Sequence, residues 1–212
     1  MRVCLASTSP ARLALLRQAG IEPETLAPAV DEDAVVAEVE AAEGRRLPAP
    51  EHVLLLARRK AADVAGRLDP DFDGVVIGGD SMFALGGEIY GKPYTAEAAI
   101  ERWNRMRGTT GVLHSGLSVI RVQPGSLPSE AFAHSEASVT FAADITDDEI
   151  SAYVATGEPL HVAGAFTVDG LAGAFIDEVD GDPSTVVGMS LSALRRLVAQ
   201  VGVGWIELWN RS

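Results

Sequence analysis

The chain has 212 residues, 47% of them apolar and 22% charged, which is enough to bury a sizeable core in one domain or in two tightly joined lobes. Acidic residues outnumber basic ones by 30 to 17, and the net charge of −13 argues against a protein that grips nucleic acid through its phosphates. No apolar run approaches the roughly 20 residues of a membrane span, so we expect neither nucleic acid nor a membrane as partner.

The N-terminal segment is typical of a strand, a turn and a helix. Residues 3–6 form a short apolar run, and residues 10–19 place leucines on one helical stripe that ends at Gly20. The opening run is too short for a signal peptide. The single cysteine, Cys4, excludes an intrachain disulfide framework and a multi-cysteine metal site, so we expect a cytoplasmic protein.

The rest of the chain alternates helical and strand-like segments, which predicts an α/β fold. Helices are predicted over residues 31–43, 51–66, 95–106, 146–155 and 191–201. A buried strand over 74–80, stopped by glycines, precedes a hairpin over 83–89, and further strands are predicted over 112–122 and 131–141. Thr146 and Glu149 form a capping box that fixes the start of their helix.

The first turn admits two interpretations. Ser9 is a good N-cap and Pro10 suits the first helical position, so the stretch from Ser7 to Ser9 lies at the positive end of a helix. Free N–H groups, hydroxyls and Arg12 then make an anion site. The alternative is a helix start with no further role, in which Arg12 is solvated.

Three further residues have both a functional and a structural interpretation. Lys60 aligns with apolar residues of its helix, either as a site ammonium or as a snorkelling side chain. Asp80 ends the predicted buried strand, where open α/β sheets place their sites, and is either a proton acceptor or metal ligand, or a capping aspartate in a turn. Glu32 is either a metal ligand or part of a solvated acidic helix start.

Other nucleotide and hydrolase motifs are incomplete or absent. “GGEIYGKP” lacks the final hydroxyl of a P-loop because Pro93 stands there, and it follows a hairpin instead of a buried strand, so Lys92 remains an isolated candidate for phosphate contact. The sequence lacks HExxH, GxSxG and CxxC. Its histidines are scattered, and we interpret His114 and His161 as structural or peripheral.

Five blocks of the chain, taken in order, match one known family. They are “LASTSPARLALL”, “ARRKAADV”, “VVIGGDSM” followed by “GEIYGKP”, “DDEISAYVATGEPLHVAGAF” and “GDPSTVVGMSL”. In order and spacing, over nearly the full chain, they resemble the Maf family of nucleoside triphosphate pyrophosphatases. The resemblance implies a single domain over residues 1–212, with a mixed twisted sheet, flanking helices and two lobes around a deep cleft, as in inosine triphosphate pyrophosphatases. It also implies a homodimer.

The same resemblance implies a reaction. A nucleoside triphosphate and water give the monophosphate and pyrophosphate, with a divalent cation such as Mg, Mn or Co. Asp80 matches the family's catalytic carboxylate, which accepts the proton of the attacking water, and Glu32 matches an acidic position associated with the metal. The positions that match the family's phosphate contacts are Ser7, Ser9, Arg12, Lys60 and Lys92.

Two departures concern substrate recognition. Where the dTTP and UTP enzymes of the family read “DKAGAYGIQG”, this chain reads “HVAGAFTVDG”, with Val162 in place of lysine and Asp169 in place of glutamine. An amide both donates and accepts hydrogen bonds, whereas a carboxylate only accepts, so Asp169 argues against a simple dTTP or UTP preference. The 7-methyl-GTP branch shares the histidine and the acid. Ala11 replaces an arginine of many relatives and affects a peripheral phosphate contact.

The family resemblance leaves one alternative from another functional class. Maf proteins are also linked to inhibition of septum formation, which would make this chain a regulatory binding protein. Asp80, with three cations at matched positions, favours the enzyme, because a pure binder does not require a proton acceptor.

Overall fold

The computed structural model describes residues 1–210 and divides into two compact units. The first unit comprises Met1–Asp80, Ser115–Ser135 and the C-terminal segment from Gly188, and the second comprises Ser81–His114 and Glu136–Val187. The unit boundaries fall inside three long strands, so β3, β5 and β6 each contribute residues to both units.

The strands form a mixed sheet, which confirms the predicted fold class. Its order is β2-β1-β3-β5-β6-β7, with β4 paired to β3. β1 is parallel to β2 and β3, whereas β4 is antiparallel to β3 and β7 to β6. The strand bounds are β1 Arg2–Ala6, β2 Glu24–Thr25, β3 Gly74–Leu85, β4 Glu88–Tyr90, β5 Thr110–Val122, β6 Ser129–Phe141 and β7 Ile176–Gly181.

The helices begin and end close to the predicted residues. Their bounds are α1 Pro10–Gln18, α2 Glu32–Glu43, α3 Ala49–Ala65, α4 Ala96–Met106, α5 Asp147–Ala155, α6 Pro183–Val187 and α7 Leu191–Gln200, with short 3₁₀ turns η1 Glu158–His161, η2 Ala163–Ala165, η3 Leu171–Phe175 and η4 Trp205–Leu208. The capping box at Thr146 and Glu149 is present, as predicted. The short helix α6 was not predicted, and α3 begins ahead of Pro50 because proline is tolerated in a first helical turn.

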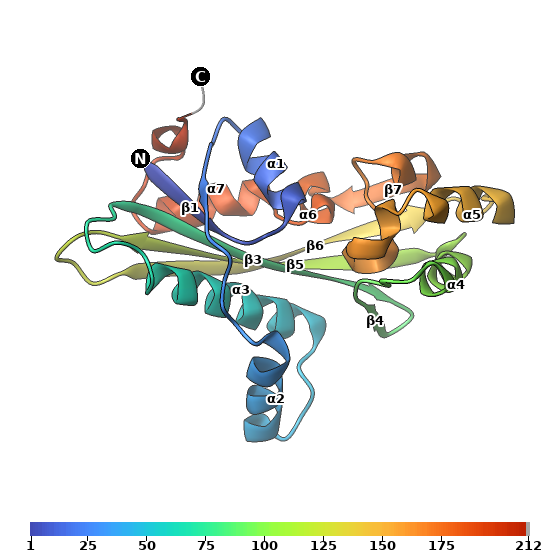
Figure 1. Ribbon diagram of the computed structural model, residues 1–212, viewed down its shortest axis with the longest axis horizontal. Coiled ribbons are helices and arrows are strands. Elements are labelled where there is room, and N and C mark those ends of the chain that lie inside the picture. Colours follow the sequence, from blue (N-terminus) through green and yellow to red (C-terminus); the bar gives the residue numbers. More distant parts are fainter. Residues whose placement is uncertain (211–212) are drawn as a thin grey trace. The chain divides into compact units, whose positions relative to one another are not determined.

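In the first unit, helices cover both faces of the strands. α3 lies along one face, and α1 and α7 lie along the other (Figure 1). Two adjacent glycines of β3 mark these faces, since successive residues of a strand point to opposite sides. A Cβ on Gly78 would come within 2.3 Å of the Ala57 carbonyl oxygen on α3, whereas a Cβ on Gly79 would lie 3.0 Å from Arg12 Nε on α1.

The prediction that glycines stop this strand near Asp80 is wrong. β3 continues to Leu85, and its last residues form the antiparallel hairpin with β4, where Phe83 pairs with Tyr90. The two glycines serve close approach of α3 and Arg12, which is the other use of glycine in a strand. Asp80 therefore lies within a continuous strand and is not at its end.

The second unit has an aromatic core. Phe83 packs edge-on against Phe141 and Phe166, with ring centroids 6.0 and 5.1 Å apart. Trp103 of α4 packs against Phe141 and Tyr153, and its indole N–H donates to the Ala165 carbonyl at 2.8 Å. Such edge-to-face pairs stabilise a core beyond simple burial. α4 and the loop before Phe166 are thereby fixed to the same core.

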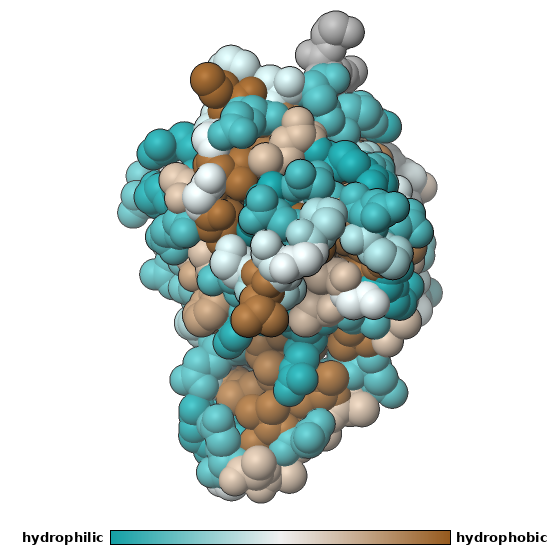
Figure 2. Space-filling model, turned by 90° about the vertical axis from the view of Figure 1, so that its left-hand side faces the viewer, coloured by the Kyte–Doolittle hydropathy of each residue, from teal (hydrophilic) through white to brown (hydrophobic). Residues whose placement is uncertain are grey.

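Helix α2 is held less deeply than the others. None of its residues is buried, and Val35, Val36 and Val39 are only partly covered. Figure 2 shows an apolar patch low on the face where α2 and α3 lie. A shallow groove between these two helices is lined by Val30, Val35, Ala62 and charged neighbours. Within residues 1–210, no helix is long and apolar enough to cross a membrane.

The close approach at Gly78 predicts a large stability effect. Gly78→Ala is expected to lower the free energy of unfolding by about 3 kcal/mol, because the added methyl meets backbone atoms of α3. Urea unfolding followed by circular dichroism measures the change. Gly91→Ala is the matched control, since its Cβ meets no atom within 4 Å and its φ lies outside the left-handed region. Equal stability of the two variants would contradict the inferred close packing.

Candidate functional site

The centre of the candidate site is the ammonium group of Lys60. Its Nζ lies 2.8 Å from Asp80 Oδ1 and 2.8 Å from Glu32 Oε1. The Lys60 side chain is 9% exposed and that of Asp80 12%, whereas Glu32 is 49% exposed. Lys60 is thus a buried cation with two carboxylate partners, and the snorkelling interpretation is wrong.

Three elements bring these groups together. Lys60 lies on the buried face of α3, and Asp80 lies two residues after Gly78 on β3, so both glycine and aspartate face α3. Glu32 is the first residue of α2, whose N-cap Asp31 accepts a hydrogen bond from the Ala34 amide. The interpretation of Asp80 as a turn cap is also wrong, because β3 runs on past it.

The first loop caps helix α1 as predicted, and its hydroxyls are hydrogen-bonded. Ser9 caps α1 by accepting from the Arg12 amide at 3.4 Å, and the Ser9 amide donates to Ser7 Oγ at 3.1 Å. Pro10 occupies the start of the helix. Since Ala6 pairs with Gly78, the loop leaves β1 beside the part of β3 that carries Asp80.

Arg12 is fixed by backbone as well as side-chain partners. Its Nε donates to the Gly188 carbonyl at 2.9 Å and its Nη1 to Ser7 Oγ at 3.3 Å. Burial lowers the pKa of Arg12, and the charges of Asp80 and Glu32 oppose that change. The interpretation of Arg12 as a solvated surface residue is therefore wrong: its side chain is partly buried and held by two hydrogen bonds.

The donor set around Lys60 suits a hard divalent cation. Glu32 and Asp80 are carboxylates that converge on one point, and a magnesium-type ion commonly takes one or two protein carboxylates together with substrate phosphates. The Glu32 side chain is 49% exposed. The carboxylate chemistry of Glu32 and Asp80 suits such an ion, and their role as metal ligands stays a prediction.

The other two predicted site residues belong to the second unit. Lys92 is exposed and directly follows the strand β4 and Gly91. Asp169 is exposed in the loop between η2 and η3. Neither the Lys92 nor the Asp169 side chain makes a hydrogen bond or ion pair with another residue in the described part of the chain.

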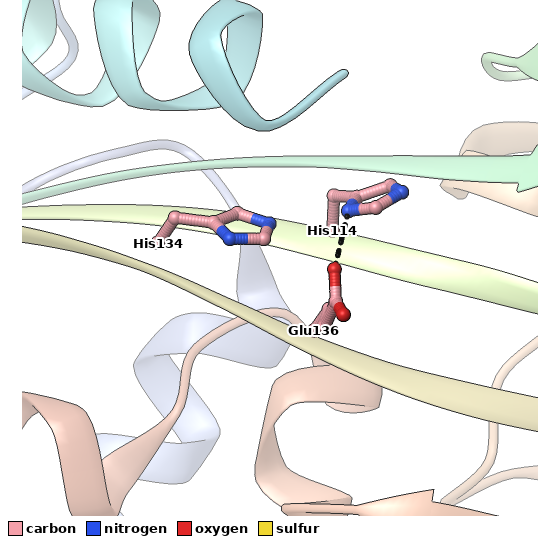
Figure 3. A group of neighbouring side chains, drawn as sticks. All are labelled: His114, His134 and Glu136. Carbon is pink, nitrogen blue, oxygen red and sulfur yellow. Dashed lines mark ion pairs between the residues drawn. The ribbon is translucent and has the colours of Figure 1, made fainter. Parts of the chain in front are cut away.

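A structural or peripheral role for His114 and His161 stays a prediction. His114 Nδ1 lies 3.4 Å from Glu136 Oε2, and both residues belong to the second unit (Figure 3). Burial lowers the pKa of His114, while Glu136 raises it. The His161 ring lies 6.2 Å from that of Tyr94, at the end of η1.

Sequence reasoning missed the residues that hold Arg12. The Gly188 carbonyl accepts from both Arg12 and the buried hydroxyl of Ser115, which donates at 3.3 Å. Gly188 has a φ of 131°, a conformation that favours glycine. In the sequence, Gly188 is visible only as a glycine shortly before the Ser190 cap. No local pattern links it to Arg12, which lies 176 positions away.

Comparison with known proteins yields one family. The model of a family described as “Maf-like protein” matches residues 2–201. A protein named nucleoside triphosphate pyrophosphatase from Leifsonia xyli is 56% identical over 100% of this chain and 98% of its own. Proteins of the same name from Rhodococcus jostii and Streptomyces coelicolor are each 50% identical, over 98% of this chain and 96% and 94% of theirs.

Among solved structures, the similarity is more distant. The Ham1 protein of Staphylococcus aureus is 14% identical, with a TM-score of 0.33, over 68% of this chain and 73% of that one. A similarity at this level adds nothing to the sequence matches.

The shared ammonium predicts energetic coupling between Lys60 and Asp80. Lys60→Met is expected to lower the free energy of unfolding by about 3 kcal/mol, because it leaves the buried Asp80 carboxylate without its cation. Combining it with Asp80→Asn should recover part of that loss, with a coupling energy of about 1–3 kcal/mol. Urea unfolding of the four proteins measures the cycle.

An exposed pair provides the control for this cycle. Arg45 and Glu51 are 48% and 49% exposed and lie 2.6 Å apart, so water screens their interaction and little coupling is expected. If the changes in unfolding free energy caused by Lys60→Met and Asp80→Asn add as closely as those at this surface pair, the buried ion pair does not stabilise the site.

Proposed function

Because the chain belongs to the Maf family, we propose that it is a nucleoside triphosphate pyrophosphatase, which releases a nucleoside monophosphate and pyrophosphate. The observation that carries the proposal is the buried Lys60 ammonium held between Asp80 and Glu32. This arrangement places a proton acceptor and a cation together, which phosphoryl transfer requires. Curated relatives that cover the whole chain bear this activity as their name.

Within this proposal, Asp80 acts as the general base. A water molecule attacks the α-phosphorus and transfers its proton to Asp80, and the bond from the α-phosphorus to the bridging oxygen breaks, so that pyrophosphate leaves. General bases of this kind accelerate reactions by about 10²–10⁴-fold. The buried position of Asp80 in a continuous strand supports the role because it fixes the carboxylate in one orientation.

The remaining site residues bind the triphosphate. Arg12 and Lys60 provide positive charge, and Ser7 and Ser9 provide hydroxyls and amides at the start of α1. Lys92 is assigned to the same task by its match to the family motif. About four negative charges on the substrate make several cations necessary for binding and for stabilising the developing charge.

Glu32 and Asp80 would hold the divalent cation, Mg, Mn or Co. Bound there with substrate oxygens, such an ion supplies Lewis-acid stabilisation of the phosphates. The chain's own residues retain their roles beside it: Lys60 keeps the two carboxylates together, and Asp80 remains the proton acceptor.

Asp169 is proposed to select the base. Its carboxylate is exposed and accepts hydrogen bonds only, so it favours a base edge that presents N–H donors. Guanine and 7-methylguanine present such an edge, whereas the O4 acceptor of uracil or thymine is disfavoured. We therefore propose a guanine-type or other modified purine triphosphate as substrate, in the manner of the family's 7-methyl-GTP branch.

The regulatory alternative is less well supported. The three relatives named above are described by their pyrophosphatase activity, and a binding protein has no need of Asp80. We further propose, from the family resemblance and the single buried Cys4, that the enzyme is a cytoplasmic homodimer.

The general-base role predicts a separation of turnover from binding. Asp80→Asn is expected to abolish pyrophosphate release while nucleotide affinity stays largely intact, because the amide keeps the shape but does not take the proton. Pyrophosphate release from a nucleotide panel with Mg, Mn or Co, together with calorimetric binding, measures both. Asp71→Asn, an exposed aspartate of the same unit, is the control. Hydrolysis by Asp80→Asn at the parental rate would exclude the role.

The base-selecting role predicts a change of preference. Asp169→Gln is expected to raise kcat/KM for dTTP and UTP relative to guanine nucleotides by about tenfold, because the amide can also donate a hydrogen bond. The same nucleotide panel provides the measurement. An unchanged order of substrates would show that Asp169 does not contact the base.

A further inference from the structure

A second anchored carboxylate, Glu158, lies outside the site described above. It is the first residue of η1, in the second unit, and its Oε1 accepts hydrogen bonds from the Tyr153 hydroxyl at 3.0 Å and from Thr167 Oγ1. The Leu171 amide donates to both carboxylate oxygens, at 3.0 and 3.2 Å. One side chain therefore joins the end of α5 to a loop about ten residues further along the chain.

The loop that Glu158 holds is the one that carries Asp169. Its two hydrogen-bonded residues, Thr167 and Leu171, stand on either side of that aspartate. A Cβ on Gly170 would lie 2.3 Å from Thr167 Oγ1 and 2.7 Å from Glu158 Oε1, so the loop is closed tightly over the carboxylate. Asp169 itself remains exposed at the tip.

Within residues 1–210, the groups that donate hydrogen bonds to Glu158 are neutral. Burial raises its pKa, but the hydrogen bonds from Thr167, the Leu171 amide and Tyr153 outweigh this and hold the pKa below its usual value. Burial, followed by the charge of Glu158, raises the pKa of Tyr153, which therefore remains a donor. The anchor stays a charged acceptor at neutral pH.

The donors to Glu158 come from two parts of the second unit. Tyr153 belongs to α5 and is buried in the aromatic core, which fixes one end of the network. Thr167 and Leu171 belong to the loop, in which Val168 packs against the aromatic core and Asp169 and Gly170 are exposed. The hydrogen bonds are therefore directed at the part of the unit that carries the proposed base contact.

We propose that Glu158 is a positioning residue for base selection: it fixes the loop from Thr167 to Leu171 and so aims the Asp169 carboxylate at the base of the nucleoside triphosphate. This inference rests on the proposed function. It assigns to Glu158 an effect on substrate preference that acts through Asp169, with no contact to the reacting phosphate.

Glu158→Gln tests the proposal, because the amide keeps the size of the side chain but turns one acceptor oxygen into a donor. The ratio of affinities for GTP and UTP, measured by calorimetry, is expected to fall about tenfold. In turnover assays the loss should lie in KM for GTP and not in kcat. Glu178→Gln, an exposed glutamate of the same unit, should leave the ratio unchanged.

A double variant distinguishes positioning from general damage. Asp169→Ala should lower the GTP/UTP ratio by a similar factor, and adding Glu158→Gln to it should cause no further change, because both act through one carboxylate. Thr167→Val removes a single hydrogen-bond donor and should lower the GTP/UTP affinity ratio by a smaller factor. This variant replaces Glu158→Gln in the test if Glu158→Gln does not fold.

The outcomes separate this inference from the proposed function. An unchanged affinity ratio in folded Glu158→Gln and Thr167→Val, or an equal loss for every nucleotide, would overturn the positioning role. Measured in the Asp80→Asn background, in which turnover is expected to be lost, the affinity ratio reports on Glu158 independently of hydrolysis. Absence of pyrophosphate release by the unsubstituted enzyme from every triphosphate would instead overturn the proposed function.

Discussion

The contact on which the first unit's site depends is the Lys60 ammonium shared by Asp80 and Glu32. Burying a charged lysine costs free energy unless a negative charge pairs with it. Asp80, one of the two carboxylates that pair with Lys60, is itself buried. This pairing constrains three features of the first unit: the face of α3 that is buried, the register of β3 and the position at which α2 starts. Although α2 buries none of its own residues, the ion pair between Glu32 and Lys60 links its first turn to α3.

The elements themselves were largely predictable from local chemistry. Ser9, Thr146 and Ser190 cap their helices with hydrogen bonds that depend on residues only three positions away, so their signals lie within a short window. The end of β3 was not predictable in the same way. Gly78 and Gly79 are equally typical of a strand that stops and of one approached closely by its neighbours, and only the positions of α3 and Arg12 decide between the two.

The residues named for the site came from the ordered blocks of the family resemblance. Local patterns favoured a snorkelling Lys60 and left Asp80 open between a site carboxylate and a turn cap. Pairing partners are distant in sequence: Lys60 and Asp80 are 20 residues apart, and Arg12 and Gly188 are 176 apart. Local patterns carry no information on such pairs, so the burial of Lys60 and the backbone anchor of Arg12 emerge only in the folded chain.

The carboxylates of Asp80 and Glu158 are held by different kinds of partner. This difference affects how the proposed substrate preference can change. Asp80 is held by a cation, so changing either partner disturbs the charge on which the chemistry depends. Glu158 is held by neutral donors from its own unit and shares no partner with Lys60. Under the proposed function, the residue at the loop tip can therefore change without disturbing the charges around Lys60.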